Sequence, residues 1–124
     1  MILLVDIGNT NIVLGFAENE GIIEKYRIKS SLNKTADEYY VLLKPILDNY
    51  KIENAIVSSV VPVITSALKK ALKKYLKKDP LIMGPGIKTG VQLKVDDPKT
   101  VGADIICDVA AMKGLADEAI VIDL

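Results

Sequence analysis

Three aspartates occupy positions where a carboxylate can take part in chemistry. Asp6 directly follows the apolar run Ile2–Val5, and burying a carboxylate at a strand end costs on the order of several kcal/mol unless something compensates the charge. Asp104 and Asp108 are four residues apart, so a helix would place these like charges on one face, where they repel. The small residues before Asp104 would let a ligand approach the backbone closely. The alternatives are a strand that simply ends at Asp6 and two exposed acids.

The segment DIGNTN, residues Asp6–Asn11, separates two apolar runs and predicts a tight turn between antiparallel strands. Gly8 and Asn9 can adopt the positive φ angles that such a turn demands. The backbone N–H groups of a turn of this kind can point one way and cradle a phosphate. Asp6, at the edge of the turn, would then hold Mg²⁺ on that phosphate, directly or through water.

The composition excludes several other kinds of function. The 124 residues fit one domain, half of them are hydrophobic, and 16 basic side chains balance 16 acidic ones. Zero net charge gives no general attraction to nucleic acid or to an anionic membrane. The chain has no histidine and only one cysteine, which excludes histidine-based catalytic triads, cysteine-based zinc sites and disulfides. Because neither a signal peptide nor an apolar stretch of transmembrane length is present, we expect a soluble cytoplasmic protein.

Hydrophobic periodicity predicts the elements that would position these residues. In the third strand, the alternation places Ile22 and Tyr26 on the same side. Thr35 and Glu38 have the spacing of a capping box, which would open a helix reaching Tyr50. The expected strands are Ile2–Val5, Asn11–Ala17, Ile22–Lys29, Ala55–Val61, Pro80–Met83, Val91–Val95 and Ala119–Asp123; the later helices are one opened by Pro62 and one over Val101–Leu115.

This order of elements predicts an α/β fold. The first three strands are joined by short turns and form an antiparallel meander. The strand–helix–strand crossovers that follow imply parallel pairing. We therefore expect a mixed five-stranded sheet, antiparallel first and then parallel, with helices on its faces.

Two further motifs have ordinary explanations. The run KKALKKYLKK places its lysines on one half of a helix and its apolar residues on the other, as in a solvated surface helix. No aromatic residue within the basic half could stack on a base, so we expect no nucleic-acid binding. The loop GPGIKTG lacks the Gly-Lys pair of a phosphate-binding P-loop, because Ile87 precedes Lys88.

Four motifs, in their order and spacing, resemble type III pantothenate kinase. They are DIGNTN at Asp6–Asn11, SSVVP at Ser58–Pro62, GPGIKTG at Gly84–Gly90 and VGAD at Val101–Asp104. The resemblance covers the whole chain and implies a ribonuclease-H-like domain of the actin-like and sugar-kinase superfamily. It also implies phosphorylation of pantothenate by ATP, the first committed step of coenzyme A synthesis, by a cytoplasmic homodimer that binds neither nucleic acid nor membrane.

The resemblance implies a role for each matching residue. Asp6 would position Mg²⁺, and Asp104 would be the general base on the substrate hydroxyl. Asp123 would bind a monovalent cation, K⁺ or NH₄⁺. The residues expected to meet ATP and its phosphates are Asp6, Gly8, Asn9, Thr10 and Asn11; those expected to line the pantothenate site are Asn9, Val95, Gly102, Ala103, Asp104 and Ile105.

Three positions depart from the family pattern, and all lie on the pantothenate side. Ile105 replaces the arginine of a Gly-Ala-Asp-Arg motif, Val95 replaces a tyrosine, and Asp108 replaces an asparagine. A related kinase with another small hydroxyl substrate, or a kinase-derived binding module without turnover, therefore remains an alternative.

The family has two such domains, with ATP in the cleft between them. We expect residues 1–118 to form the first, actin-like domain, and residues 119–124 to be the first strand of a second domain. A chain with half of the nucleotide cleft would be inactive alone.

Overall fold

The computed structural model describes residues 1–19, 21–84, 86–113, 115 and 118–122. Its centre is a five-stranded sheet in the order β3-β2-β1-β4-β5. Strand β1 (Ile2–Ile7) pairs antiparallel with β2 (Asn11–Glu18), which pairs antiparallel with β3 (Gly21–Lys29). Strand β4 (Asn54–Ser59) runs parallel to β1, and β5 (Leu81–Ile82) runs parallel to β4. The predicted mixed five-stranded sheet, antiparallel first and then parallel, is confirmed.

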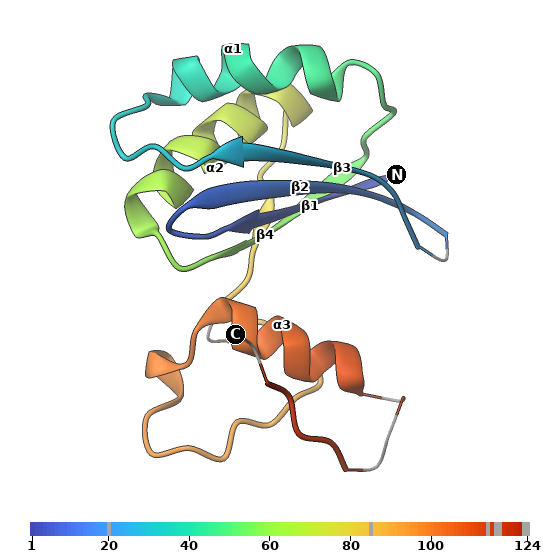
Figure 1. Cartoon of the computed structure of the whole chain (residues 1–124), viewed down its shortest axis with the longest axis vertical. Coiled ribbons are helices and arrows are strands. Elements are labelled where there is room, and N and C mark those ends of the chain that lie inside the picture. Colours follow the sequence, from blue (N-terminus) through green and yellow to red (C-terminus); the bar gives the residue numbers. More distant parts are fainter. Residues whose placement is uncertain (20, 85, 114, 116–117, 123–124) are drawn as a thin grey trace.

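Helices lie on both sides of this sheet (Figure 1). Helix α1 (Ala36–Leu47) and helix α2 (Pro62–Leu76) cover one face, whereas the short 3-10 helix η1 (Pro98–Thr100) and helix α3 (Ala103–Met112) lie on the other side. The predicted capping box opens α1, because Thr35 Oγ1 accepts from the Glu38 N–H and Glu38 Oε2 accepts from the Thr35 N–H. Pro62 opens α2 as expected.

The core lies between the sheet and the first two helices. Alternate residues of the strands point into it, because successive side chains of a strand point to opposite faces. Leu68 of α2, Tyr39 of α1 and Phe16 of β2 are fully buried there. The Phe16 ring stacks on Tyr50 with 3.9 Å between the centroids and meets Tyr26 edge-on at 5.8 Å.

Replacing Phe16 by alanine should destabilise the domain by about 3–5 kcal/mol, because the buried ring leaves a cavity between Tyr26 and Tyr50. Urea unfolding followed by circular dichroism measures this loss. Leu32→Ala is the matched control, since Leu32 is 63% exposed and its truncation should change the free energy of unfolding by less than about 0.5 kcal/mol. Equal losses in the two variants would contradict this account of the core.

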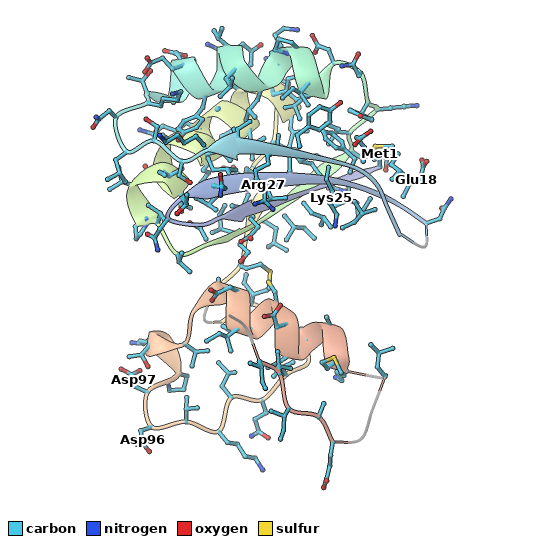
Figure 2. All side chains as sticks on the ribbon, in the orientation of Figure 1. Met1, Glu18, Lys25, Arg27, Asp96 and Asp97 are labelled. Carbon is cyan, nitrogen blue, oxygen red and sulfur yellow. The ribbon has the colours of Figure 1, made fainter. Side chains whose placement is uncertain are left out.

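The prediction that Ile22 and Tyr26 lie on the same side of the sheet is wrong. A bulge between Phe16 and Ala17 pairs Phe16 with Glu24 and Ala17 with Ile22, so one extra residue of β3 has no opposite. Ile22 therefore shares a sheet face with Lys25, away from Tyr26. Figure 2 labels Lys25 and Arg27, which belong to this face of β3, the one not covered by α1 and α2.

Two predicted strands are not formed. Residues 91–95 have the required alternation, but no strand of the described residues pairs with them, and the Val91 N–H donates to Thr89 Oγ1 in a turn. Residues 119–122 of the strand expected over Ala119–Asp123 are likewise not a strand, and Asp123 lies outside the described residues. A strand needs a neighbour to satisfy its backbone groups, and alternation alone does not supply one.

The helices also end sooner than predicted. Helix α1 ends at Leu47 rather than Tyr50, because Asn49 Nδ2 donates to the carbonyl groups of Pro45 and Ile46 and caps the last turn. Helix α3 covers residues 103–112 of the predicted 101–115. Within the described ranges, no helix is both long and apolar enough to cross a membrane.

Candidate active site

Asp6 lies near the carboxyl end of β1, on the sheet face opposite α1 and α2. The register places Asp6 beside Val13 of β2 and beside Ser58 of β4. The neighbours of Asp6 in β1, Val5 and Ile7, point into the core, so the alternation of the strand directs Asp6 outward. Its side chain is exposed, and the desolvation cost expected for a buried carboxylate does not arise.

The turn after β1 is compact and held from two sides. The Gly8 N–H donates to the Asn11 carbonyl oxygen at 2.9 Å, and the Gly8 carbonyl oxygen accepts from Ser30 Oγ at 2.6 Å. The Ser30 N–H also donates to the Thr10 carbonyl oxygen, at 2.9 Å. The end of β3 thereby fixes the loop between β1 and β2, and the side chains of Asn9 and Thr10 remain exposed.

The prediction that Gly8 and Asn9 adopt positive φ angles is wrong. Neither residue has a positive φ; among described residues, such angles occur at Asn19, Lys77, Gly86 and Gly90. Gly8 is required for space instead, because a Cβ there would lie 3.2 Å from the Asn11 carbonyl oxygen. The hydrogen bond inside the turn also occupies the Gly8 N–H.

Helix α3 brings two carboxylates to Asp6 from almost one hundred residues away. A cavity of about 320 Å³ is lined by Asp6, Ser58, Asp104, Cys107 and Asp108. Asp104 and Asp108 share one face of α3, as their spacing predicts, and this face meets the carboxyl ends of β1 and β4. The grouping of Asp6 and Asp104 as one site is thus consistent with the geometry.

Gly102 allows Asp104 to fold back at the start of α3. Asp104 Oδ1 accepts from the Ile105 N–H at 2.8 Å, and a Cβ on Gly102 would collide with this carboxylate oxygen. Since Gly102 is the N-cap and makes no side-chain cap, the carboxylate also lies at the positive end of the helix. The other oxygen, Oδ2, takes no part in this bond and remains available to accept a proton.

The pKa of Cys107 is affected by the charged groups around the cavity. Its pKa is raised, chiefly because the thiol is partly buried, and the charges of Asp108, Asp6 and Asp104 raise the pKa further, while the Ser58 hydroxyl lowers it. The three carboxylates are therefore close enough to act together on one group. Because these acidic side chains line one cavity, their negative charge attracts a cation.

The donor set fits a magnesium ion carried by a nucleotide. No group of three or more histidine, cysteine or acidic side chains among the described residues forms a ready-made metal site. Mg²⁺ usually binds through one or two carboxylates, with waters and substrate phosphates completing its shell. Asp6 beside the turn can supply such a carboxylate, and the cavity leaves room for water.

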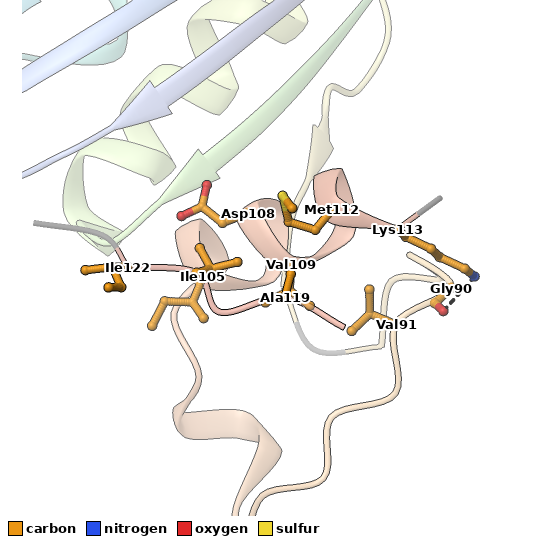
Figure 3. Close-up of a pocket in the computed structure, with 10 residues that line it drawn as sticks. Gly90, Val91, Ile105, Asp108, Val109, Met112, Lys113, Ala119 and Ile122 are labelled. Carbon is orange, nitrogen blue, oxygen red and sulfur yellow. Dashed lines mark hydrogen bonds between the residues drawn. The ribbon is translucent and has the colours of Figure 1, made fainter. Parts of the chain in front are cut away.

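Two of the residues predicted for the pantothenate site, Val95 and Ile105, do not line this cavity. Val95 is 50% exposed in the loop before η1, and it does not line the cavity of Asp6. Ile105 faces a different, larger cavity of about 750 Å³, together with Asp108, Val109 and Met112 (Figure 3). Lys113 borders that cavity and donates to the Gly90 carbonyl oxygen at 2.9 Å.

Sequence reasoning named Asp108 as a candidate acid but missed two residues of the smaller cavity, Ser58 and Cys107. A signal existed for Ser58, since the carboxyl ends of parallel neighbouring strands meet at one edge of a sheet, and Ser58 lies in the strand predicted over Ala55–Val61. For Cys107 the only signal was its position between two acids of one helix.

Comparison with known proteins identifies the family of the chain. A family model described as type III pantothenate kinase matches residues 2–124. The chain belongs to the type III pantothenate kinase family. The type III pantothenate kinase of Bifidobacterium longum (strain DJO10A) is 44% identical over an alignment of 115 positions, which covers 89% of this chain and 45% of that protein. The type III pantothenate kinase of Halalkalibacterium halodurans is 43% identical over an alignment of 129 positions, which covers 99% of this chain and 51% of that protein.

The chain spans about half the length of the curated type III pantothenate kinases that it matches. Among solved structures, a protein from Porphyromonas gingivalis assigned as an N-acetylglucosamine kinase is similar over 66% of this chain and 32% of its own, with 17% identity and a TM-score of 0.48.

Proposed function

We propose that this protein takes part in the phosphorylation of pantothenate by ATP, as the N-terminal half of a type III pantothenate kinase. The observation that carries the proposal is the convergence of Asp6 and Asp104 on one cavity, in a chain whose family membership extends over residues 2–124. Asp6 stands beside the phosphate turn and Asp104 at the start of α3, so one group can meet the nucleotide while the other meets the acceptor.

In this proposal each residue has one task. Asp104 takes the proton of the acceptor hydroxyl at the carboxylate oxygen that the helix does not use, which makes the oxygen of the acceptor a better nucleophile. Asn9, Thr10 and Asn11 orient the phosphates. The Gly8 N–H is not counted among these groups, because it already donates to the Asn11 carbonyl oxygen within the turn. Asp6 would hold Mg²⁺, which supplies neutralisation of the charge on the transferring phosphoryl group. A monovalent cation would be held by Asp123.

The acceptor pocket is the finer part of the proposal. Gly102 and Ala103 allow the acceptor to approach the start of α3, and Ile105 presents an apolar side chain, 48% exposed, where the family carries arginine. This apolar surface also favours the second candidate, a kinase for another small hydroxyl compound. Val95 stays a proposed contact only, since it lies in the exposed loop. We further propose a homodimer that works in the cytoplasm without nucleic acid or membrane.

The experiment is a coupled ATP assay with pantothenate and a panel of small alcohols, performed on the full-length protein and on the 124-residue chain. The full-length protein should turn over pantothenate in the usual kinase range of roughly 1–100 s⁻¹, whereas the chain alone, which spans about half the length of its relatives, should not, since we propose that the nucleotide site needs groups from both halves. Turnover of a different alcohol would select the second candidate. Calorimetric binding of pantothenate without any turnover would instead indicate a binding module.

A further inference from the structure

One hydroxyl of the cavity lacks the hydrogen bond that burial normally demands. Ser58 Oγ is buried and makes no hydrogen bond within the part of the chain that the structure describes. Buried polar side chains nearly always find a partner, and an unmade hydrogen bond costs roughly 1–3 kcal/mol. Alanine at this position would avoid that cost, so the Ser58 hydroxyl needs a partner that the described residues do not supply.

The position of Ser58 shows where that partner would be. In the parallel register of β1 and β4, Ser58 is the direct neighbour of Asp6, and both side chains lie on the face away from α1 and α2. Ser58 also lines the cavity that contains Asp104 and Asp108. The Cys107 thiol is near enough for the Ser58 hydroxyl to lower its pKa, but a thiol is a weak hydrogen-bonding group and does not satisfy the serine.

The next residue along the strand has the opposite character. Ser59 Oγ accepts from the Val61 N–H at 3.0 Å and from Thr65 Oγ1 at 2.6 Å. These bonds fasten the end of β4 to the beginning of α2, so Ser59 has a structural role with its partners in place. Two adjacent serines thus differ in whether their hydroxyl groups are used by the fold.

We propose that Ser58 is a positioning residue that holds a water of the Mg²⁺ shell beside Asp6. The inference rests on the proposed function and assigns Ser58 a task within the same site. Mg²⁺ retains several of its waters in sites built on one or two carboxylates, and a serine hydroxyl can accept from such a water while donating to a carboxylate. Ser58 acts through that water and touches neither the transferred phosphoryl group nor the acceptor.

The test is calorimetric titration of the full-length protein with ATP, with and without Mg²⁺, for the unsubstituted protein and Ser58→Ala. The alanine variant should bind Mg²⁺-ATP about tenfold more weakly, as expected for loss of one hydrogen bond to a charged cluster, and should bind Mg²⁺-free ATP unchanged. Its melting temperature should not fall, because Ser58 Oγ makes no hydrogen bond to the residues that the structure describes.

Ser59→Ala is the matched control and should show the reverse. It should lower the melting temperature and leave the Mg²⁺ dependence of ATP binding intact, since its bonds lie within the fold. Equal Mg²⁺-ATP affinity in Ser58→Ala and the unsubstituted protein would overturn this inference alone, as would a loss confined to pantothenate affinity. Absence of Mg²⁺-dependent ATP binding by the unsubstituted protein would overturn the proposed function as well.

Discussion

Asp104→Asn in the full-length protein should lower kcat by about 10²–10⁴-fold, the contribution of a positioned general base. Asparagine keeps the shape of the side chain, and its oxygen can still accept from the Ile105 N–H, so α3 should begin as before. Only the capacity to take the proton of the acceptor hydroxyl is lost. ATP affinity should barely change, because the phosphate turn lies at the end of β1. Steady-state kinetics with both substrates measures the effect.

Two companion variants make this result specific. Asp96→Asn is the matched control, since Asp96 is exposed in the loop far from the sheet (Figure 2), and it should leave kcat unchanged. Asp108→Asn tests the competing carboxylate, because Asp108 lines the same cavity. Full kcat in Asp104→Asn together with a large loss in Asp108→Asn would move the base to Asp108 and refute the role proposed for Asp104.

Asp6→Asn should weaken Mg²⁺-ATP binding by roughly 10–100-fold, the range seen when a group that supports a bound metal is removed. Asp6 is exposed at the end of β1, so removal of its charge should leave the melting temperature nearly unchanged. Calorimetry with and without Mg²⁺ separates the two contributions, since the loss should disappear when ATP is titrated without the metal.

The control for Asp6 is Glu18→Gln, which removes one exposed negative charge at the end of β2. Glu18 lies at the opposite end of the strands from the turn after β1 (Figure 2). This variant should bind Mg²⁺-ATP normally, so a general effect of net charge can be excluded. If Asp6→Asn instead melts at a lower temperature and binds Mg²⁺-ATP with unchanged affinity, then Asp6 has a structural role.

The elements of the first 82 residues were predictable because their signals are local. Apolar runs of strand length, the capping box of Thr35 and Glu38, and Pro62 at a helix start each depend on residues only a few positions apart. The parallel pairing in the second half of the sheet followed from the helices that connect its strands, whereas the choice of β1 as the neighbour of β4 was not predicted. Asp6 could be placed at the end of a strand because the apolar run directly before it is also a local signal.

The side of Ile22 could not be predicted, because one bulged residue moves it to the other face of the sheet. The alternation of residues 91–95 was misleading for a related reason, since pairing depends on a free neighbouring edge and not on the pattern itself. The role of Gly8 was also unforeseen. Its hydrogen atom leaves space for the Asn11 carbonyl oxygen, a contact that exists only after the turn has closed.

The sequence alone determined the kinds of groups available to this protein: carboxylates in place of histidines, a glycine-containing turn after the first strand, and small residues before Asp104. Only the tertiary structure decided which of these groups meet. The docking of α3 against the carboxyl ends of β1 and β4 brings Asp104 and Asp108 to Asp6 and leaves Val95 in an exposed loop. The same docking encloses Ser58, whose hydroxyl makes no hydrogen bond to any of the described residues. Such contacts depend on packing between distant segments, which the local periodicity of the chain does not encode.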